Sequence, residues 1–73
     1  MTVKQLIEQL QEQDQDRRVV VRGYESGVDD VIRLERCKLK LHVNEELYYG
    51  DHEIDREGDT PAIEIIGDRK SNV

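Results

Sequence analysis

The chain has 73 residues and a mass of 8.6 kDa; 36% of its residues are hydrophobic, 38% are charged, and the net charge is −6 at pH 7. This apolar content is enough for one small core, so we expect a single domain over residues 1–73, without a signal peptide or the roughly 20-residue apolar run that crosses a bilayer. The acidic excess lies entirely after Val43 and disfavours attraction to duplex DNA or to an anionic membrane, which requires clustered Lys and Arg.

The first predicted element is a helix that begins at Val3. Its apolar face has the spacing i, i+3, i+4, i+7 and consists of Val3, Leu6, Ile7 and Leu10. Thr2 is the predicted N-cap, and Gln5 is placed to complete a capping box with it. Polar residues 14–16 interrupt the apolar period, so we expect the helix to end near Gln13.

Two strands are predicted next, over residues 17–24 and 31–43, with a turn over residues 23–30 between them. The apolar alternation of the second strand changes phase, which predicts a bulge or bend near Glu35 and Arg36. Beyond that point we expect Cys37 and Leu39 to point inward. The opposite face then carries a basic stripe that consists of Arg36, Lys38, Lys40 and His42.

A last strand is predicted over residues 62–66, with Ile63 and Ile65 inward and Glu64 outward, followed by a frayed tail over residues 68–73. The least periodic stretch, residues 44–60, is predicted to be a long acidic loop, and loops of this length are uncommon unless they are functional or disordered. The elements therefore predict an α+β fold of order αβββ, in which one N-terminal helix packs on a three-stranded antiparallel sheet in two layers.

One sheet face is left uncovered in this prediction, and it should carry Val20, Tyr24 and Ile66. Because so small a core gives little stability, we expect additional burial by self-association into a homo-oligomer, a dimer, through this face or through strand edges. The single cysteine, Cys37, cannot form a disulfide framework and indicates a reducing, cytoplasmic setting.

Three segments of the sequence, TVKQLIEQL, VVVRGYESGVDDV and HVNEELYYGDHE, resemble a small uncharacterised family of bacterial and phage-encoded proteins. That family opens with a T-V-x-x-L-I helix, continues through G-Y-E-x-G-x-D-D-V and carries an aromatic-Y-G-x-H-E segment later. The likeness extends from Thr2 to Glu53 and is most specific in GYE and YYG-x-HE. Because the family has no settled activity, the resemblance implies a compact domain of its own and little about function.

The tyrosines lie in the two glycine-containing loops, where flat apolar rings with a polar tip are typical of binding surfaces. We expect the recognition residues to be Tyr24, Glu25, Tyr48, Tyr49, His52 and Glu53, forming a small pocket or a contact with a protein partner. The alternative is that Tyr48 and Tyr49 only cover the end of the core while Gly50 turns the chain.

The basic stripe is the second candidate binding surface, through Arg36, Lys38 and Lys40 beside Arg18 and Arg22 on the neighbouring strand. It suits a small phosphate-containing ligand such as a nucleotide, with Tyr24 stacking on the base. It suits equally the acidic residues 45–59 of the same chain or of a second copy. A third interpretation is a solvated sheet face whose ion pairs contribute about 0 to 1 kcal/mol each.

Catalytic and metal sites are not favoured by the sequence. Asp51, His52 and Glu53 with His42 offer ligands for a divalent ion, but three adjacent residues rarely point to one centre, so neither a metal nor another cofactor is predicted. Cys37 and the serines lack the context of a nucleophile, and no catalytic residue is assigned. The predicted function is a non-enzymatic, self-associating binding module. The alternatives are a phage-type inhibitor that acts against host defence or sequesters its nucleotide signal, and a small metal-dependent hydrolase.

Overall fold

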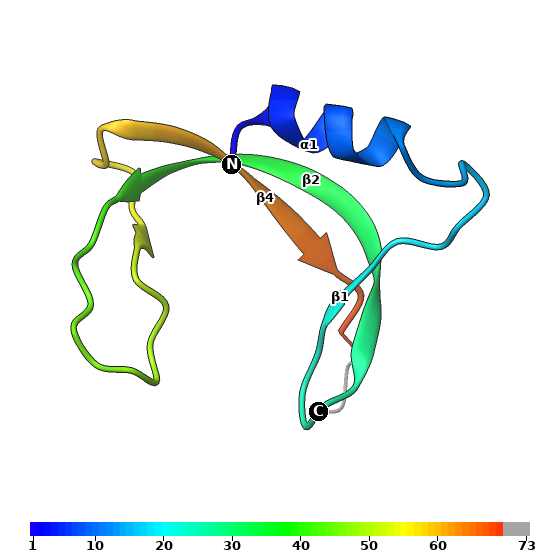
Figure 1. Ribbon diagram of the computed structural model, residues 1–73. Helices are drawn as coiled ribbons and strands as arrows, with labels where there is room; N and C mark the ends of the chain where they lie inside the picture. The colour runs from blue at the N-terminus through cyan, green and yellow to red at the C-terminus, as the bar shows by residue number, and fades with distance from the viewer. Residues whose placement is uncertain (70–73) are drawn as a thin grey trace. The chain divides into compact units, whose positions relative to one another are not determined.

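The computed structural model describes residues 1–69, which form an α+β fold of one helix and an antiparallel sheet of four strands (Figure 1). The elements in chain order are α1 (Val3–Gln11), β1 (Val20–Arg22), β2 (Val28–Lys40), β3 (Glu53–Ile54) and β4 (Thr60–Gly67). The predicted class is therefore confirmed, whereas the strand count was too low by one. The missing strand, β3, lies inside residues 44–60, which the sequence analysis left as one loop.

The long strand β2 organises the sheet because it pairs with each of the other three strands. Its beginning pairs with β1, with Val20 opposite Asp30. Its end pairs with β3, with Lys40 opposite Glu53. The strand runs without a break through Glu35 and Arg36, and the bulge or bend expected near these two residues stays a prediction.

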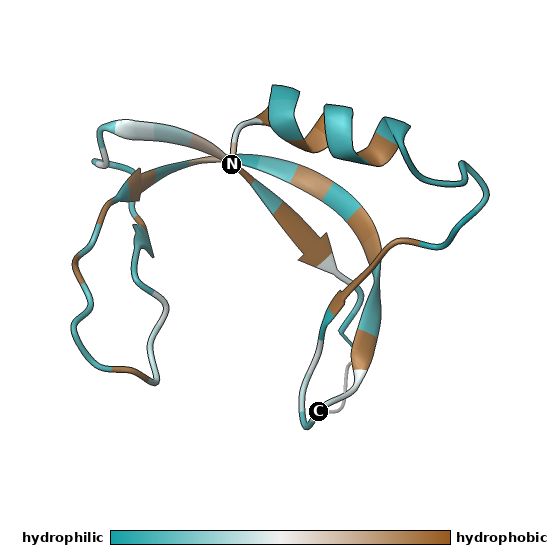
Figure 2. Ribbon diagram, in the orientation of Figure 1, coloured by the Kyte–Doolittle hydropathy of each residue, from teal (hydrophilic) through white to brown (hydrophobic). Residues whose placement is uncertain are grey.

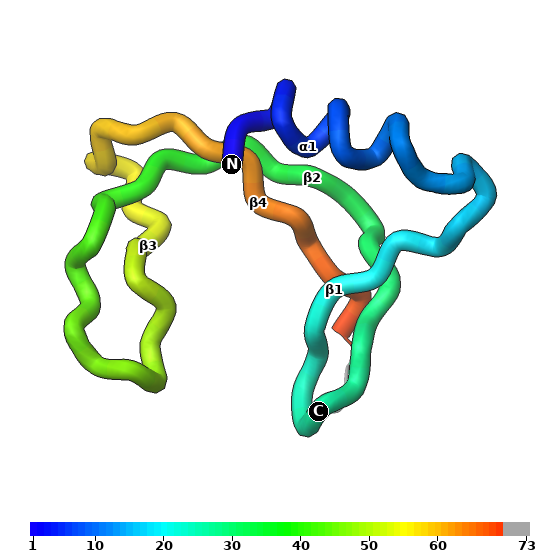
Figure 3. The backbone as a smooth tube through the Cα atoms, in the orientation of Figure 1, coloured from blue at the N-terminus to red at the C-terminus, as the bar shows by residue number. Residues whose placement is uncertain are grey.

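The described residues divide into two compact units. Unit 1 consists of residues 1–33 and 66–69, and unit 2 consists of residues 34–65. Figure 3 follows the backbone through α1 and β1 in unit 1 and through the hairpin of β2 and β3 in unit 2. Within residues 1–69, no helix is long and apolar enough to cross a membrane.

The start of α1 in unit 1 is fixed by the predicted capping box. The Thr2 hydroxyl accepts a hydrogen bond from the Gln5 backbone N–H at 3.1 Å, and the Gln5 side chain accepts one from the Thr2 N–H at 2.7 Å. The helix ends at Gln11, earlier than expected, because the Leu10 carbonyl accepts hydrogen bonds from the backbone of Gln13 and from the side chain of Gln15. These bonds satisfy a carbonyl that has no partner further along the helix.

The apolar residues of unit 1 are only partly covered. Figure 2 shows them along one side of α1, where Leu6 is half-buried and Val3, Ile7 and Leu10 remain exposed. In the strands, Val20 is exposed as expected for an uncovered face, but Ile66 is half-buried. The tail begins later than predicted, since Asp68 donates a backbone hydrogen bond to the Asp30 carbonyl at 2.7 Å. The rest of the predicted tail, residues 70–73, lies outside the described residues.

In unit 2 the side chains of β2 that are more buried are the predicted ones, whereas those of β4 are not. Cys37 and Leu39 are half-buried, and the basic residues that alternate with them, Arg36, Lys38 and Lys40, are exposed. In β4, however, Ile63 and Ile65 are 42% and 40% exposed while Glu64 is half-buried, the reverse of the expected order. The assignment of this face from hydrophobicity alone was therefore wrong.

No hydrophobic side chain among residues 1–69 is buried, and Gly58 is the one buried residue in that range. Gly58 lies against β2: a Cβ atom added to it would stand 2.5 Å from the carbonyl oxygen of Leu39. This position therefore requires glycine, because the backbone of Gly58 approaches the backbone of Leu39 too closely for a side chain.

Candidate functional site

The candidate site lies in unit 2, in the loop that joins β2 to β3. The backbone N–H groups of Val43 and Asn44 both donate to the Asp51 carbonyl, at 3.0 and 3.2 Å. The Asn44 side chain donates to the Gly50 carbonyl at 2.7 Å. These bonds tie the two arms together, so residues 44–50, which we call the tyrosine loop, are a loop closed at its base.

The tip of the tyrosine loop presents apolar groups to solvent. Tyr49 N–H donates to the Glu46 carbonyl at 3.2 Å and closes the turn at the tip. Leu47 is fully exposed, Tyr48 is 81% exposed and Tyr49 is 61% exposed. The two tyrosine rings lie against each other, with centroids 4.9 Å apart. The alternative that these tyrosines cover the end of a core is therefore wrong, and Leu47 joins them although the sequence analysis did not select it.

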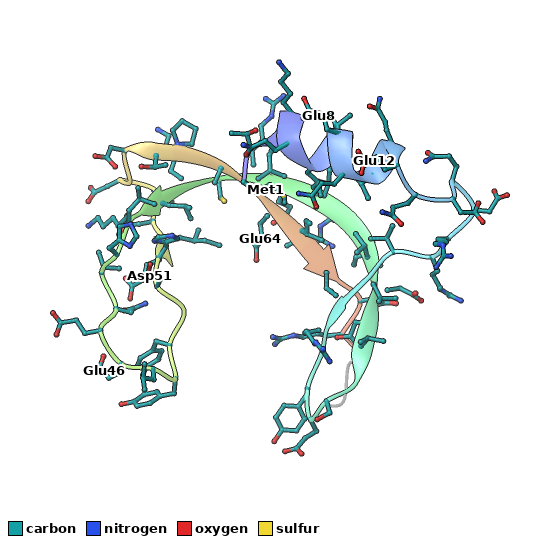
Figure 4. The ribbon with its side chains drawn as sticks, in the orientation of Figure 1. Met1, Glu8, Glu12, Glu46, Asp51 and Glu64 are labelled. Carbon is teal, nitrogen blue, oxygen red and sulfur yellow. The ribbon has the colours of Figure 1, made fainter. Side chains whose placement is uncertain are left out.

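The base of the loop carries a cluster of three polar side chains, His42, Asp51 and His52 (Figure 4, where Asp51 and Glu46 label the base and the tip). His42 follows β2 with φ at 53°, in the left-handed region that few residues other than glycine adopt. Its ring lies edge-on to that of His52, with centroids 4.7 Å apart. Of the four residues considered as metal ligands, these three come together, while Glu53 belongs to β3.

Hydrogen bonds fix the orientation of both imidazoles. His42 Nδ1 lies 2.7 Å from Asp51 Oδ2 and donates a hydrogen bond to the carboxylate. His52 Nδ1 accepts a hydrogen bond from the His42 backbone N–H at 2.9 Å, so Nδ1 is unprotonated. Two imidazoles and one carboxylate thus lie together, a donor set suited to a divalent transition metal.

A basic groove lies elsewhere in unit 2. It has a volume of about 530 Å³ and is lined by Arg36, Cys37, Lys38, Arg56, Pro61, Ala62 and Ile63. Two members of the predicted basic stripe, Arg36 and Lys38, contribute to it, and Arg56 adds a third cation that the sequence analysis did not place there. The floor is apolar, so the groove suits a ligand that combines negative charge with an apolar group.

Lys40, the third predicted binding residue of the stripe, interacts with an acidic residue of the same chain. Its Nζ lies 3.3 Å from Asp55 Oδ2. The backbone N–H of Glu57 and the Lys40 ammonium both lower the pKa of Asp55 below its usual value. Part of the acidic segment, residues 45–59, thus contacts the basic stripe within one chain. This contact agrees with the alternative in which the stripe receives the acidic residues of the same chain.

The remaining predicted site residues belong to unit 1. Tyr24 is 89% exposed at the turn between β1 and β2, and Glu25 follows it with φ at 52°. Arg18 is held by Asp30 through two hydrogen bonds of 2.7 and 3.0 Å, which raise the pKa of the guanidinium above its usual value. The expectation that Tyr24 and Glu25 meet the tyrosine loop stays a prediction.

Comparison with protein-family models, with curated proteins and with solved structures gives no significant match to the chain. The resemblance carried by the GYE and YYG-x-HE segments therefore stays a prediction as well.

Proposed function

We propose that this chain is a small non-enzymatic interaction module that self-associates through the tyrosine loop. The observation that carries the proposal is the tip of that loop, where Leu47, Tyr48 and Tyr49 are exposed on a backbone closed by hydrogen bonds. Aromatic and aliphatic side chains on an ordered loop bind with little loss of conformational entropy, and such anchors dominate the energy of protein interfaces.

The partner we propose is a second copy of the chain, because the loop and the basic groove complement each other. The tip is flanked by Glu45 and Glu46, and the groove combines three cations with an apolar floor. In a symmetric dimer the loop of each copy would enter the groove of the other, which is the self-complementary arrangement of a two-fold interface. Burial of the tip would add apolar contact, and the charges would fix its orientation.

The second support is the exposure of apolar side chains within each unit. None of the hydrophobic side chains in residues 1–69 is buried. A chain of this size gains little stability from one core alone, and contact with a second copy supplies apolar burial that the isolated chain lacks. The single Cys37 agrees with a cytoplasmic location for such a module.

Charge reversal across the proposed contact tests the arrangement. Light scattering and sedimentation at several concentrations should find a dimer for the wild-type chain. Glu46→Lys and Lys38→Glu should each weaken the dimer, because each places like charges together, and the double variant should recover most of the affinity. Arg69→Glu, an exposed charge reversal in unit 1, is the control. A wild-type chain that stays monomeric at high micromolar concentration contradicts self-association, and a double variant without recovery contradicts the pairing of loop and groove.

A small anionic ligand in the groove is a second candidate, favoured by the presence of Arg36, Lys38 and Arg56 among the residues of a mostly apolar lining. Guanidinium and ammonium groups bind phosphate oxygens, and the floor would accept a base or another apolar group. In this case the chain would sequester a nucleotide. An inhibitor of a host defence that uses a nucleotide as its signal would act in this way. A thermal-shift panel of nucleotides tests it: stabilisation that disappears in Lys38→Glu supports the candidate, and absence of stabilisation by every nucleotide contradicts it.

A further inference from the structure

We propose that His42, Asp51 and His52 form a binding site for a divalent transition-metal ion, with zinc as the typical occupant. The fold brings one potential ligand atom from each of the three side chains to within 4.8 Å of the others. Two residues come from the returning arm of the hairpin and one from the outgoing arm, so the backbone rather than local sequence creates the cluster.

The distances between the ligand atoms are close to those of a metal centre. Asp51 Oδ2 lies 2.7 Å from His42 Nδ1 and 3.9 Å from His52 Nδ1. Zinc binds imidazole nitrogen and carboxylate oxygen at about 2.0 to 2.2 Å, which separates neighbouring ligands in a tetrahedral site by about 3.3 Å. The first distance must therefore lengthen and the second shorten by about 0.6 Å each, and the two imidazoles, whose ligand atoms lie within 4.8 Å of each other, must approach by up to about 1.5 Å. Side-chain rotation allows these changes because all three side chains are exposed.

Two hydrogen bonds hold the cluster together before an ion binds. The proton between His42 Nδ1 and Asp51 Oδ2 is the one that the ion would replace, and it would leave to solvent on binding. The lone pair of His52 Nδ1 accepts the His42 backbone N–H, so His52 would bind the ion either by opening that bond or through Nε2. The left-handed backbone conformation of His42 places its N–H and its side chain on this cluster. Such a conformation is strained for a residue other than glycine and is of the kind found at ligand sites.

The donor set indicates the class of ion. Two imidazoles and one carboxylate suit zinc, cobalt, nickel or copper, whereas calcium and magnesium prefer sites made of oxygen ligands alone. Three protein ligands leave a fourth tetrahedral position, which water or a group from another molecule can take. The ion would join the two arms of the hairpin immediately below the tyrosine loop and hold its base.

The test uses the full chain without an affinity tag. Isothermal titration with ZnCl₂ should give one ion per chain, and CoCl₂ should give the visible absorption of a tetrahedral site. His42→Asn removes one imidazole with a residue that tolerates the left-handed backbone, and Asp51→Asn removes the carboxylate charge at constant shape. Each should weaken zinc binding by about 10- to 100-fold or more. Glu53→Gln removes an adjacent charge outside the cluster and should change the affinity less than twofold.

Circular dichroism of each variant establishes that it is folded before titration. The proposal is overturned if the wild-type chain binds no zinc at millimolar concentration, or if a folded His42→Asn variant binds it as tightly as the wild type. It is also overturned if Glu53→Gln weakens binding as much as Asp51→Asn, because general negative charge rather than the cluster would then hold the ion. Displacement of zinc by equimolar magnesium would contradict the proposed class of ion.

Discussion

Replacing Leu47 by serine is the most direct measure of the tyrosine loop's contribution to self-association. The side chain is fully exposed and makes no hydrogen bond, so the change leaves the fold of the monomer intact. In the proposed dimer it becomes buried, and burial of a leucine side chain contributes about 1.5 to 3 kcal/mol. A symmetric dimer loses this contribution twice, so dissociation becomes easier by about 3 to 6 kcal/mol. The dimer Kd should therefore rise by roughly 10²- to 10⁴-fold.

Sedimentation velocity over a concentration series measures that change directly. Tyr24→Ser is the comparison, because Tyr24 is 89% exposed on a turn of unit 1 and this variant distinguishes an interface made by the tyrosine loop alone from one that also includes that turn. We expect it to change the Kd by less than a factor of three. If Leu47→Ser leaves the Kd unchanged, the tip is not in the interface. If Tyr24→Ser weakens the dimer as strongly, the interface includes the turn of unit 1 and the reasoning from the loop alone is refuted.

Three further predictions concern the fold. Gly58→Ala should lower the free energy of unfolding by about 1 to 3 kcal/mol in urea titration, since the new Cβ meets the Leu39 backbone; no change would mean that the strand shifts freely. Thr2→Ala should reduce helical circular dichroism and cost about 0.5 to 2 kcal/mol, and unchanged helicity would contradict a role for the capping box. The lowered pKa of Asp55 means that its stabilising contribution is present above about pH 4 and is lost as the pH falls through the folded-state value. Asp55→Asn should therefore be less stable than wild type at pH 7 and equal to it near pH 2; a difference independent of pH would contradict the linkage to Lys40 and the Glu57 N–H.

Local signals in the sequence were sufficient for the helix. Thr2 and Gln5 form their capping box within one turn, and the apolar period of α1 depends on no other part of the chain. The end of the helix was predicted less well, because the side chain of Gln15 folds back onto the Leu10 carbonyl and no periodicity encodes that bond. The class of the fold followed from the same local patterns.

Pairing and coverage were harder to predict than the elements themselves. Strand β3 has two residues and exists because they pair with Leu39 and Lys40, which lie far away in the sequence. Which side chains of β4 are buried depends on which side of the strand another element covers. The identities of Ile63 and Ile65 carry no information about that coverage. The exposure of the tyrosine tip could likewise not be predicted, because the sequence allowed both a binding loop and a segment that covers the end of the core.

The histidine cluster could have been found with one additional step. The register that pairs Lys40 with Glu53, continued by two residues along each arm, places His42 opposite Asp51. The sequence offered His42 together with Asp51, His52 and Glu53 as possible ligands, but three of these are adjacent in the chain and indicated no common centre. A hairpin hypothesis for residues 39–54 would have separated Glu53 from the set and placed His42 opposite Asp51.

The hydrogen bonds that close the tyrosine loop come from Val43, Asn44, Gly50 and Asp51, and the turn at its tip is closed by backbone atoms alone. Side chains from Glu45 to Tyr49 are thus absent from the bonds that hold the base. The tip can therefore accept substitutions while the hydrogen bonds at the base are kept. A change of partner then requires different side chains at a few adjacent positions and no change of fold. The same separation makes the segment a natural place to graft foreign peptides.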